Sequence, residues 1–474
     1  MRRTRWYHYI TLNLPWFGLT MVSGSMTPLI LPFLVQQFVP AASKNSFYGD
    51  LRFYGLMVAL LVQPVAGLLS DRSTSRWGRR RPFILVGALL AALLLGGIGL
   101  AAGYWPLFAL SLLLQAAANV THGALQGVIP DLVPHQWRGT ASGIKALMEV
   151  LPLVVIALTV ARLLDTGRLW TALLVIGGAL LSAVLVMVAT TREEPLPAPP
   201  NLPIKESVLR VGALAIAFLL IVRGFRAALL WLGSQVAGDP DVVVLAMGGA
   251  GLLATVGAIV LGVWYSVRMG IGPAIRKRPA FTWWVVNRLL FLAAIGIIQG
   301  FSLYYVQDVL EAPNAASVTG QLMTMVGLCT VVSAVVSGPL ADLLGRKALL
   351  AAAGALAALG TVALLASSTL PMVYLSSSVV GLGAGTFMAT NWALGTDLVP
   401  VAESGRFLGV SNLAGAGAGS VAAGIGGPLA DLLNAQRADA GYLAVFGIAA
   451  ACFLLSILVL PRIPESYKLS VSAK

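Results

Sequence analysis

Apolar segments of about 20 residues or more recur along nearly the whole 474-residue chain. Each is long enough to cross a hydrocarbon layer of about 30 Å as an α-helix. Hydrophobic residues make up 58% of the sequence and charged residues only 10%, whereas about 25% of the residues in soluble domains are charged. The alternating strands of a membrane β-barrel are absent from the sequence. The sequence therefore predicts an all-α protein that crosses a membrane many times.

The apolar segments divide into fourteen predicted spans. Six precede a proline-rich linker, "TREEPLPAPPNLPIKES", and they lie near residues 9–36, 49–70, 82–103, 105–131, 139–163 and 168–190. Eight follow it, near residues 208–236, 242–267, 279–304, 316–341, 347–367, 371–397, 404–430 and 441–461. We expect five parts: a six-helix bundle over 1–190, a cytoplasmic linker over 191–207, an inserted two-helix hairpin with a basic loop over 208–278, a second bundle over 279–461, and a cytoplasmic tail over 462–474.

Lysine and arginine are distributed unevenly between the two sides of these spans. If both termini are cytoplasmic, 22 of the 31 basic residues lie in inner segments and only Lys44, Arg52, Arg162, Arg168 and Arg437 lie in outer ones. Cytoplasmic loops retain basic residues, so this orientation is the predicted one, in what we expect to be a bacterial plasma membrane. The net charge of +13 is then explained by topology and not by nucleic-acid binding.

A basic loop pattern occurs twice. "GLLSDRSTSRWGRRR" begins at Gly67, and a shorter version, "GPLADLLGRK", begins at Gly338. Asp71 and Asp342 occupy the same place in the two patterns, four positions after the first glycine. Each pattern falls at the inner end of the second helix of a six-helix group. The repetition indicates two related halves.

A second pattern supports the same division. "PDLVPHQWRGTASG" contains Asp131, and "TDLVPVAESGRFLG" contains Asp397 at the same place. The separation between these two aspartates is nearly the same as that between Asp71 and Asp342. Each pattern falls at the inner end of the fourth helix of its group. Two related halves joined by a linker can rock about a central site, which is the architecture of transporters that work by alternating access.

The G-x-x-x-D-R…G-R-R loop, repeated over essentially the whole chain, resembles the major facilitator superfamily. Its longer form, "SDRSTSRWGRRRPF", is similar to that of plant sucrose transporters, their animal relatives and the glycoside-pentoside-hexuronide symporters. This resemblance implies the major facilitator fold, in which two pseudo-symmetric six-helix bundles surround a central cavity. The two-helix hairpin is then an insertion between the bundles.

The repeated loops are predicted to form a latch that exists only while the cytoplasmic side is closed. Gly67 and Gly338 permit close helix approach, and we expect Asp71 near the helix start at 404–406 and Asp342 near that at 139–142, where N–H groups are free. The other predicted members are Arg72, Arg79, Arg80, Asp131, Arg138, Arg346, Lys347, Asp397 and Arg406. Alternatively the arginines serve topology and lipid headgroups alone, which is the role we assign to Arg76 and Arg81.

Ionisable groups in the hydrocarbon are functional candidates because their burial is costly. Glu149 lies about ten residues into the fifth helix, near the middle of the membrane, and is the predicted proton carrier. Lys145, one turn earlier, could instead neutralise it. Arg288, at similar depth in the first helix of the second half, is the third member, because the resemblance places the first and fifth helices at the cavity. His122 could relay protons or simply form a hydrogen bond between helices.

Arg223 and Arg226 lie midway along the first helix of the hairpin. We expect them either to pack against protein or to extend toward the headgroups.

Uncharged polar and aromatic side chains at depth form the predicted substrate site. Its members are Asn13, Trp16, Gln63, Gln115, Asn119, Gln126, Trp284, Asn287, Asn391 and Trp392. Amide groups beside aromatic faces suit a glycoside, and they suit many neutral amphiphiles as well. The sequence departs from the relatives at two of these positions: where plant sucrose transporters have an aspartate and an arginine on the fourth helix, it has Gln115 and Gln126. The second helix also lacks the aspartates of melibiose-type symporters, and Gln63 is its deep polar group.

These patterns predict a secondary transporter that couples inward movement of a sugar or glycoside to protons through Glu149. An exporter of amphiphilic compounds or drugs is an alternative, and so is a non-transporting membrane scaffold such as the pigment-complex assembly factors of this fold. An enzyme is not expected, because no nucleotide loop or nucleophile and base pattern appears. The expected partners are a small-molecule substrate, protons and membrane lipids, without a cofactor, metal or nucleic acid, and the protein is expected to be a monomer.

Overall fold

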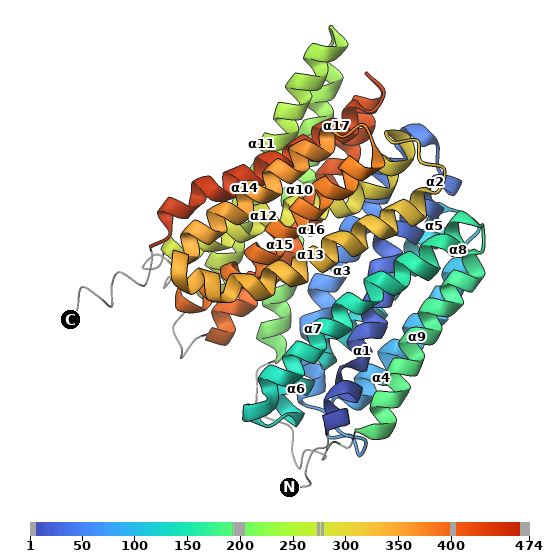
Figure 1. Ribbon diagram of the computed structural model, residues 1–474, viewed down its shortest axis with the longest axis vertical. Coiled ribbons are helices and arrows are strands. Elements are labelled where there is room, and N and C mark those ends of the chain that lie inside the picture. Colours follow the sequence, from blue (N-terminus) through green and yellow to red (C-terminus); the bar gives the residue numbers. More distant parts are fainter. Residues whose placement is uncertain are drawn as a thin grey trace, which may run out of the picture. The chain divides into compact units, whose positions relative to one another are not determined.

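The computed structural model describes residues 6–191, 193, 204–272, 275, 279–398 and 404–464, and this part of the chain is helical, without a β-strand (Figure 1). The helices before the linker are α1 (Trp6–Ser25), α2 (Leu31–Phe38), α3 (Lys44–Asp71), α4 (Arg81–Gly99), α5 (Tyr104–Leu125), α6 (Val128–Leu132), α7 (Arg138–Val155), α8 (Ala161–Asp165) and α9 (Leu169–Thr190). Those after it are α10 (Ile204–Gln235), α11 (Pro240–Ile271), α12 (Pro279–Asp308), α13 (Ala315–Leu344), α14 (Arg346–Leu365), α15 (Leu370–Leu398), α16 (Ser404–Asn434) and α17 (Ala440–Val459).

Two spans contain a wide turn of π-helix. Met26–Ile30 joins α1 to α2, and Ile156–Val160 joins α7 to α8. Pro28 lies in the first of these turns and Pro152 lies four residues before the second. Proline lacks an N–H group and so interrupts the helical hydrogen bonds, which the π-helical turns accommodate. The shorter helices therefore form continuous spans, Tyr7–Phe38 and Arg138–Asp165.

Thirteen helices within the described residues are long and apolar enough to cross a membrane. They match thirteen of the fourteen spans expected from the sequence. The remaining span, near 404–430, is covered by α16, and many side chains of that helix lie outside the described part. The prediction of an all-α protein with many membrane spans is confirmed.

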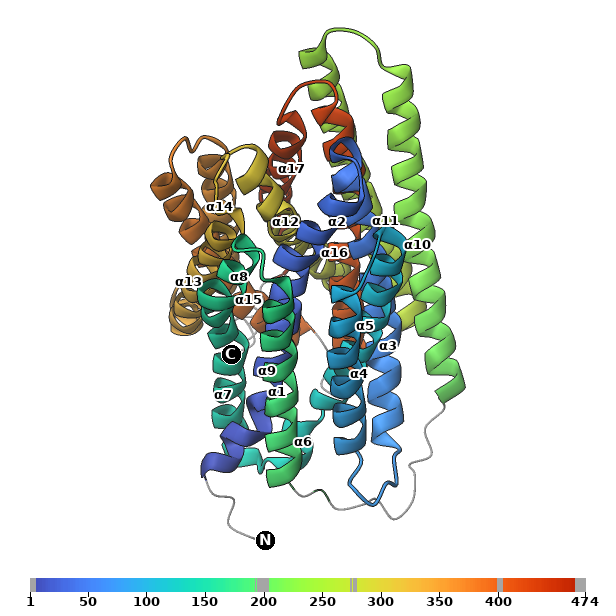
Figure 2. The same cartoon turned by 90° about the vertical axis from the view of Figure 1, so that its right-hand side faces the viewer.

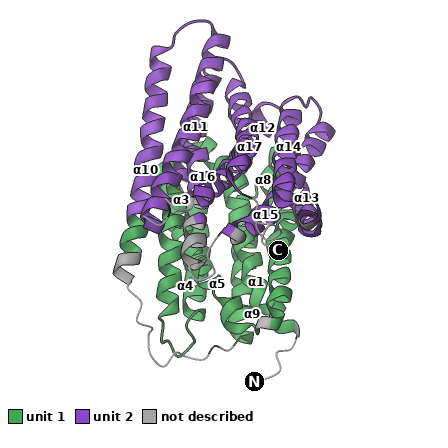
Figure 3. Ribbon diagram, turned by 90° about the vertical axis from the view of Figure 1, so that its left-hand side faces the viewer, with its two compact units in different colours: residues 1–39, 54–212, 313–321 green, residues 40–53, 213–312, 322–474 purple. Residues whose placement is uncertain are grey.

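The chain forms two compact units (Figure 3). Unit 1 contains residues 1–39, 54–212 and 313–321, and unit 2 contains residues 40–53, 213–312 and 322–474. The first turns of α3 belong to unit 2, and the rest of that helix belongs to unit 1. The first turns of α13 belong to unit 1, and the rest of that helix belongs to unit 2. The division into parts by sequence repeat stays a prediction.

In unit 1, α1 packs along α7 and α9, and α4 packs along α5 and α9 (Figure 2). Small residues allow these helices to approach closely. A side chain at Gly18 would collide with Leu180 of α9, and one at Gly87 would collide with Thr121 of α5.

In unit 2, α14 packs against α15 and α17, while α12 lies against α16 and α17. The rings of Phe291 and Phe387 stack with their centroids 3.7 Å apart. Gly383 faces the backbone of α14, where a larger residue would not fit. This close packing fixes the faces of α12 and α15 that carry the polar residues described below.

The inserted hairpin, α10 and α11, packs on the rest of unit 2. Phe218 of α10 fills the space left by Gly262 of α11 and Gly417 of α16, and α11 lies along α16. Arg226 forms an ion pair with Asp50 in the second turn of α3, and Nη1 of Arg223 lies 3.4 Å from the same carboxylate. Of the two alternatives for these arginines, packing against protein is therefore the one observed.

Candidate functional site

A polar cluster in unit 1 joins α1, α5 and α7 in the interior of their spans. The ring of Trp16 lies edge-on to that of His122, with centroids 5.1 Å apart. Nζ of Lys145 lies 4.0 Å from the centroid of the Trp16 ring and 3.2 Å from Oε1 of Glu149. Nε2 of Gln126 lies 3.5 Å from Nε2 of His122. Three predicted proton-coupling residues thus gather at one predicted substrate residue, Trp16.

The orientation of Glu149 decides whether it can act in transport. Successive residues of an α-helix are about 100° apart, so Glu149 lies about 40° from Lys145 and about 200° from Leu147 and Leu151. Those two leucines are exposed on the opposite face of α7, as side chains in contact with lipid would be. The side chain of Glu149 is 41% exposed. The carboxylate is therefore on the protein side of α7 and is accessible there.

Other predicted substrate residues of unit 1 brace the helices. Asn13 is fully buried, and its Nδ2 donates to the carbonyl oxygens of Tyr9, 2.8 Å away, and of Ala141 on α7, 3.1 Å away. Asn119 donates to the Gln115 carbonyl oxygen on its own helix. Gln63 and Gln115 have half-buried side chains. The structure brings Trp16, Gln126 and the charged residues together, and it places Asn13 in a supporting position.

A second polar network, in unit 2, joins α12, α15 and α17. Nδ2 of Asn391 donates to Oδ1 of Asn287, 2.9 Å away, and Nδ2 of Asn287 donates to the Ser456 carbonyl oxygen, 2.7 Å away. Nε1 of Trp284 donates to the Asn391 carbonyl oxygen, 3.0 Å away. The Trp284, Asn287 and Asn391 side chains are buried. These three residues therefore form a framework that contacts little solvent.

Arg288 and Trp392 form the accessible edge of this network. The guanidinium carbon of Arg288 lies 5.1 Å from the Trp392 ring centroid and 5.9 Å from that of Trp284, and its Nη1 lies 3.4 Å from Oδ1 of Asn391. Its Nε atom is buried and has no hydrogen-bond partner in the described part of the chain. Trp392 is 38% exposed. An aromatic face beside a cation that has hydrogen bonds to spare can bind an oxygen-rich ligand.

The basic loop after α3 forms a compact ionic cluster within unit 1. Arg80, with a side chain only 7% exposed, pairs with Asp71 and with Asp131, whose Oδ2 lies 2.9 Å from its Nε. Its Nη1 donates to Oγ of Ser70, and Arg79 also pairs with Asp131. Of the arginines assigned to the latch, Arg79 and Arg80 thus form ion pairs with aspartates of the same group.

For the remaining predicted latch residues, the described side-chain hydrogen bonds are to backbone carbonyl oxygens. Arg138 donates to the carbonyl oxygens of Val133 and Pro130 at the end of α6, and Arg346 donates to that of Ala393. Two nitrogen atoms of Arg72 are buried and have no hydrogen-bond partner among the residues that the structure describes. The half-buried Lys347 has no ion pair within the part of the chain that is described. The side chains of Asp342, Asp397 and Arg406 lie outside the described residues, so the pairing of the latch aspartates with opposite helix starts stays a prediction.

The two glycines of the repeated loops, Gly67 and Gly338, differ in how closely other helices approach them. A side chain at Gly67 would be in ordinary contact with the Gly123 carbonyl oxygen of α5, and one at Gly123 would collide with the backbone of α3. Close helix approach is therefore observed on the Gly67 side. At Gly338 no described atom lies within 4 Å of the position of a Cβ.

Glu193 is a member of the ionic cluster after α3 that the sequence did not indicate. Its Oε2 accepts a hydrogen bond of 2.8 Å from the Arg80 backbone N–H, and a side chain at Gly78 would collide with it. Burial raises the pKa of the Glu193 carboxyl group, against the opposing effect of hydrogen bonds and charge from Arg80 and Arg81. The carboxylate thus ties the start of the linker to the basic loop.

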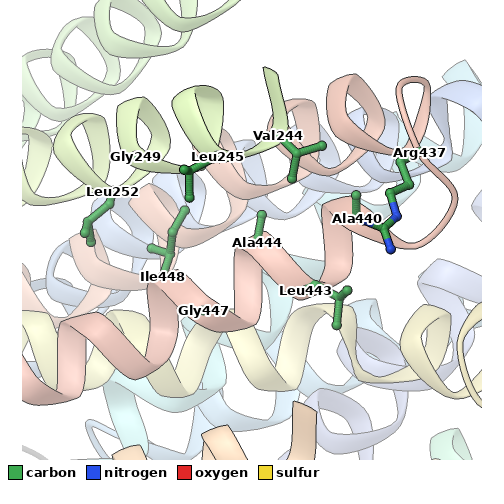
Figure 4. A pocket seen from close by; sticks show the side chains of 11 residues that line it. Val244, Leu245, Gly249, Leu252, Arg437, Ala440, Leu443, Ala444, Gly447 and Ile448 are labelled. Carbon is green, nitrogen blue, oxygen red and sulfur yellow. The ribbon is translucent and has the colours of Figure 1, made fainter. Parts of the chain in front are cut away.

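A groove of about 290 Å³ lies between α11 and α17, and none of its lining residues belongs to either polar cluster (Figure 4). Apolar and small residues line it, with Arg437 at one end. Its apolar lining does not suit a polar substrate. Within the described part of the chain, no three His, Cys, Asp or Glu side chains are grouped so as to hold a metal ion.

Comparisons with known proteins agree with this architecture. Over 91 residues the chain is 43% identical to proton-associated sugar transporter A of Homo sapiens, covering 18% of this chain and 12% of that protein. Over 119 residues it is 31% identical to a sucrose transport protein of Oryza sativa subsp. japonica, covering 19% and 21%. The matched segments thus span less than a quarter of either relative.

Solved structures are similar over nearly the whole chain. A peptide transporter in complex with sulfate has a TM-score of 0.67 at 18% identity, covering 96% of this chain and 95% of that one. A nucleoside transporter has a TM-score of 0.66 at 12% identity, covering 97% and 100%. At these identities the likeness concerns the fold. The family model that matches residues 16–310 and 288–474 describes the Major Facilitator Superfamily, and the chain therefore belongs to that family.

Proposed function

We propose that the protein is a secondary active transporter that works by alternating access and couples the uptake of a sugar or glycoside to protons. The observation that carries this proposal is the position of Glu149, an accessible carboxylate within a membrane span, next to Lys145 and Trp16. Placing an ionisable group at such a depth costs free energy, so its presence is better explained by a function than by stability.

The proposed coupling step exchanges the partner of Glu149. While Glu149 is ionised, Lys145 neutralises it across 3.2 Å. A proton that enters from the outer side converts the carboxylate to the neutral acid, which frees Lys145, already over the Trp16 ring, to interact with substrate. When the cavity opens inward, the proton leaves to the cytoplasm and the ion pair forms again.

Substrate binding is assigned to one accessible aromatic face and to hydrogen-bonding groups around a second, buried indole. Trp392 with Arg288 provides the face. Lys145, above the buried Trp16 ring, and Gln126, beside His122, provide the hydrogen-bonding groups. Sugar hydroxyl groups accept and donate hydrogen bonds, and the apolar face of a sugar ring packs on an indole. The partial relatives named for sugar and sucrose transport support this substrate class.

Uptake by purified protein in liposomes tests the proposal. A panel of disaccharides and aryl glycosides is supplied outside, with an inward proton gradient or none, and a pH-sensitive dye reports proton entry. We expect at least one sugar to accumulate severalfold more with the gradient and to carry protons with it, and a protonophore should abolish the difference. Export of amphiphilic dyes, or no movement of any compound, would overturn the proposal.

A further inference from the structure

The carboxylate of Asp165 binds the first turn of a helix from the other predicted repeat. Asp165 is the last residue of α8. Its Oδ1 accepts from the Ala316 backbone N–H, 3.1 Å away, and its Oδ2 accepts from that of Ser317, 2.8 Å away. Both donors are among the first three residues of α13, whose N–H groups have no partner within the helix. All of these residues belong to unit 1.

Asp431 makes the corresponding contact within unit 2. Its Oδ1 accepts from the Asn45 backbone N–H, 3.2 Å away, and its Oδ2 accepts from that of Ser46, 2.6 Å away. Nδ2 of Asn45 adds a third hydrogen bond of 2.9 Å. Asn45 and Ser46 are the second and third residues of α3, just as Ala316 and Ser317 are in α13.

The two contacts are equivalent in the sequence repeat. Asp165 and Asp431 have the same separation along the chain as Asp131 and Asp397 of the second repeated pattern. Ser46 and Ser317 have the same separation as the loop aspartates Asp71 and Asp342. The same pseudo-symmetry that produced the repeated cytoplasmic loops therefore produced a pair of helix caps at the ends that the predicted topology places outside.

An acid at these positions is unfavourable for its own helix. The C-terminal end of a helix carries a partial negative charge, so Asp165 at the end of α8 and Asp431 in the last turn of α16 are locally destabilising. The N-terminal ends of α13 and α3 compensate, because their free N–H groups and partial positive charge favour a carboxylate. Each acid is thus explained by a contact with the other repeat and by nothing in its own helix.

We propose that Asp165 and Asp431 form a symmetric outer latch that holds the extracellular ends of the two repeats together. The latch closes when both carboxylates cap the opposite helix starts, and it opens when the cavity opens outward. The proposal rests on the alternating-access part of the proposed function. It does not depend on which substrate or ion is carried.

Distances between spin labels test the latch. Labels at the exposed residues Ala102 and Thr369, in outer loops of the first and second repeats, report the opening of the outer side once Cys329 and Cys452 have been replaced by serine. We expect Asp165→Asn with Asp431→Asn to move the distribution toward longer distances, with the outward-open population rising about tenfold or more, because a neutral amide caps a helix start less strongly than a carboxylate. Each single variant should give a smaller shift in the same direction.

Asp241→Asn is the matched control. Asp241 also lies at an outer helix end, but it belongs to the hairpin, it pairs with the Arg437 side chain and, among the described residues, caps no helix of the other repeat, and both side chains are well exposed. This variant should leave the distances unchanged. Unchanged distances in the double variant, with folding verified by its elution as a single species, would overturn the latch. If the distances shift and no sugar is transported, the latch stands and the substrate assignment fails.

Discussion

Lys145 and Glu149 lie one turn apart on the same face of α7, with Nζ 3.2 Å from Oε1. Both side chains are partly accessible, at 32% and 41% exposure, so the pair is not sealed in the packed interior. An accessible ion pair of this kind is worth little stability in itself. Its position in a membrane span, beside Trp16 and His122, is therefore better explained by a role in transport than by a role in folding.

Replacement of Glu149 by glutamine should separate binding from coupling. We expect Glu149→Gln to abolish accumulation driven by a proton gradient while substrate exchange between the two sides of the membrane continues, because the amide keeps the shape of the side chain but cannot carry a proton. Exchange and gradient-driven uptake are measured in the same liposomes. The control is Leu151→Gln, which adds an amide to the opposite face of α7. Full gradient-driven uptake by Glu149→Gln would show that the proton is carried elsewhere.

Arg80 should be the most important residue of the basic loop after α3 for stability. Arg80→Ala leaves Asp71 and Asp131 without their shared cation, which we expect to cost about 3 kcal/mol of unfolding free energy, since the removal of one member of a buried ionic group leaves uncompensated charge. Thermal unfolding in detergent measures the loss. Arg76→Ala, at an exposed position in the same loop, should change stability by less than about 0.5 kcal/mol. Equal effects of the two variants would contradict the assignment.

The raised pKa of Glu193 predicts a dependence of stability on pH. A carboxyl group whose pKa is higher in the folded protein favours folding below its unfolded pKa, and that contribution is lost as the pH rises through the folded pKa. The melting temperature of the wild type, relative to Glu193→Gln, should therefore fall as the pH rises from below the ordinary carboxyl pKa through the raised pKa of Glu193. The opposite trend would mean that attraction by Arg80 and Arg81 outweighs burial. Asp241→Asn is again the control.

The hydropathy of the sequence was sufficient to predict the membrane helices. It could not predict which distant residues contact one another. The predicted spans match the observed ones because membrane helices must satisfy their backbone hydrogen bonds within a continuous apolar segment. Pairing of Arg226 with Asp50, or of Asp431 with Asn45, depends on tertiary packing that no local pattern encodes. The repeat did contain a usable signal for the two helix caps, because Asp165 and Asp431 share the separation of Asp131 and Asp397 in the second repeated pattern. In the candidate functional site, residue type alone indicated Glu149 and Lys145 as functional residues. It could not show that Trp392 is accessible and that Trp284 is buried.

The ion pair between Arg226 and Asp50 should anchor the inserted hairpin. Arg226→Leu leaves the carboxylate of Asp50 with only the more exposed Arg223, and we expect a loss of about 1–3 kcal/mol in stability. The double variant with Asp50→Leu should recover part of that loss, because the carboxylate that lost its main partner is then removed as well. A double-mutant cycle on thermal unfolding measures the coupling between the two residues. Additive effects would show that the pair does not contribute.

Trp392 should contribute to substrate affinity through its ring. With Arg288 on one side and an exposed fraction of 38%, the indole can pack against the apolar face of a sugar, as aromatic side chains do in carbohydrate sites. Trp392→Ala should raise the KM for transport about tenfold, and Trp392→Phe should restore part of the affinity because a smaller aromatic face remains. Trp105→Ala removes an indole that is 71% exposed at the start of α5, and it should leave KM unchanged. If alanine and phenylalanine at position 392 behave alike, the indole acts by filling space and the substrate is held elsewhere.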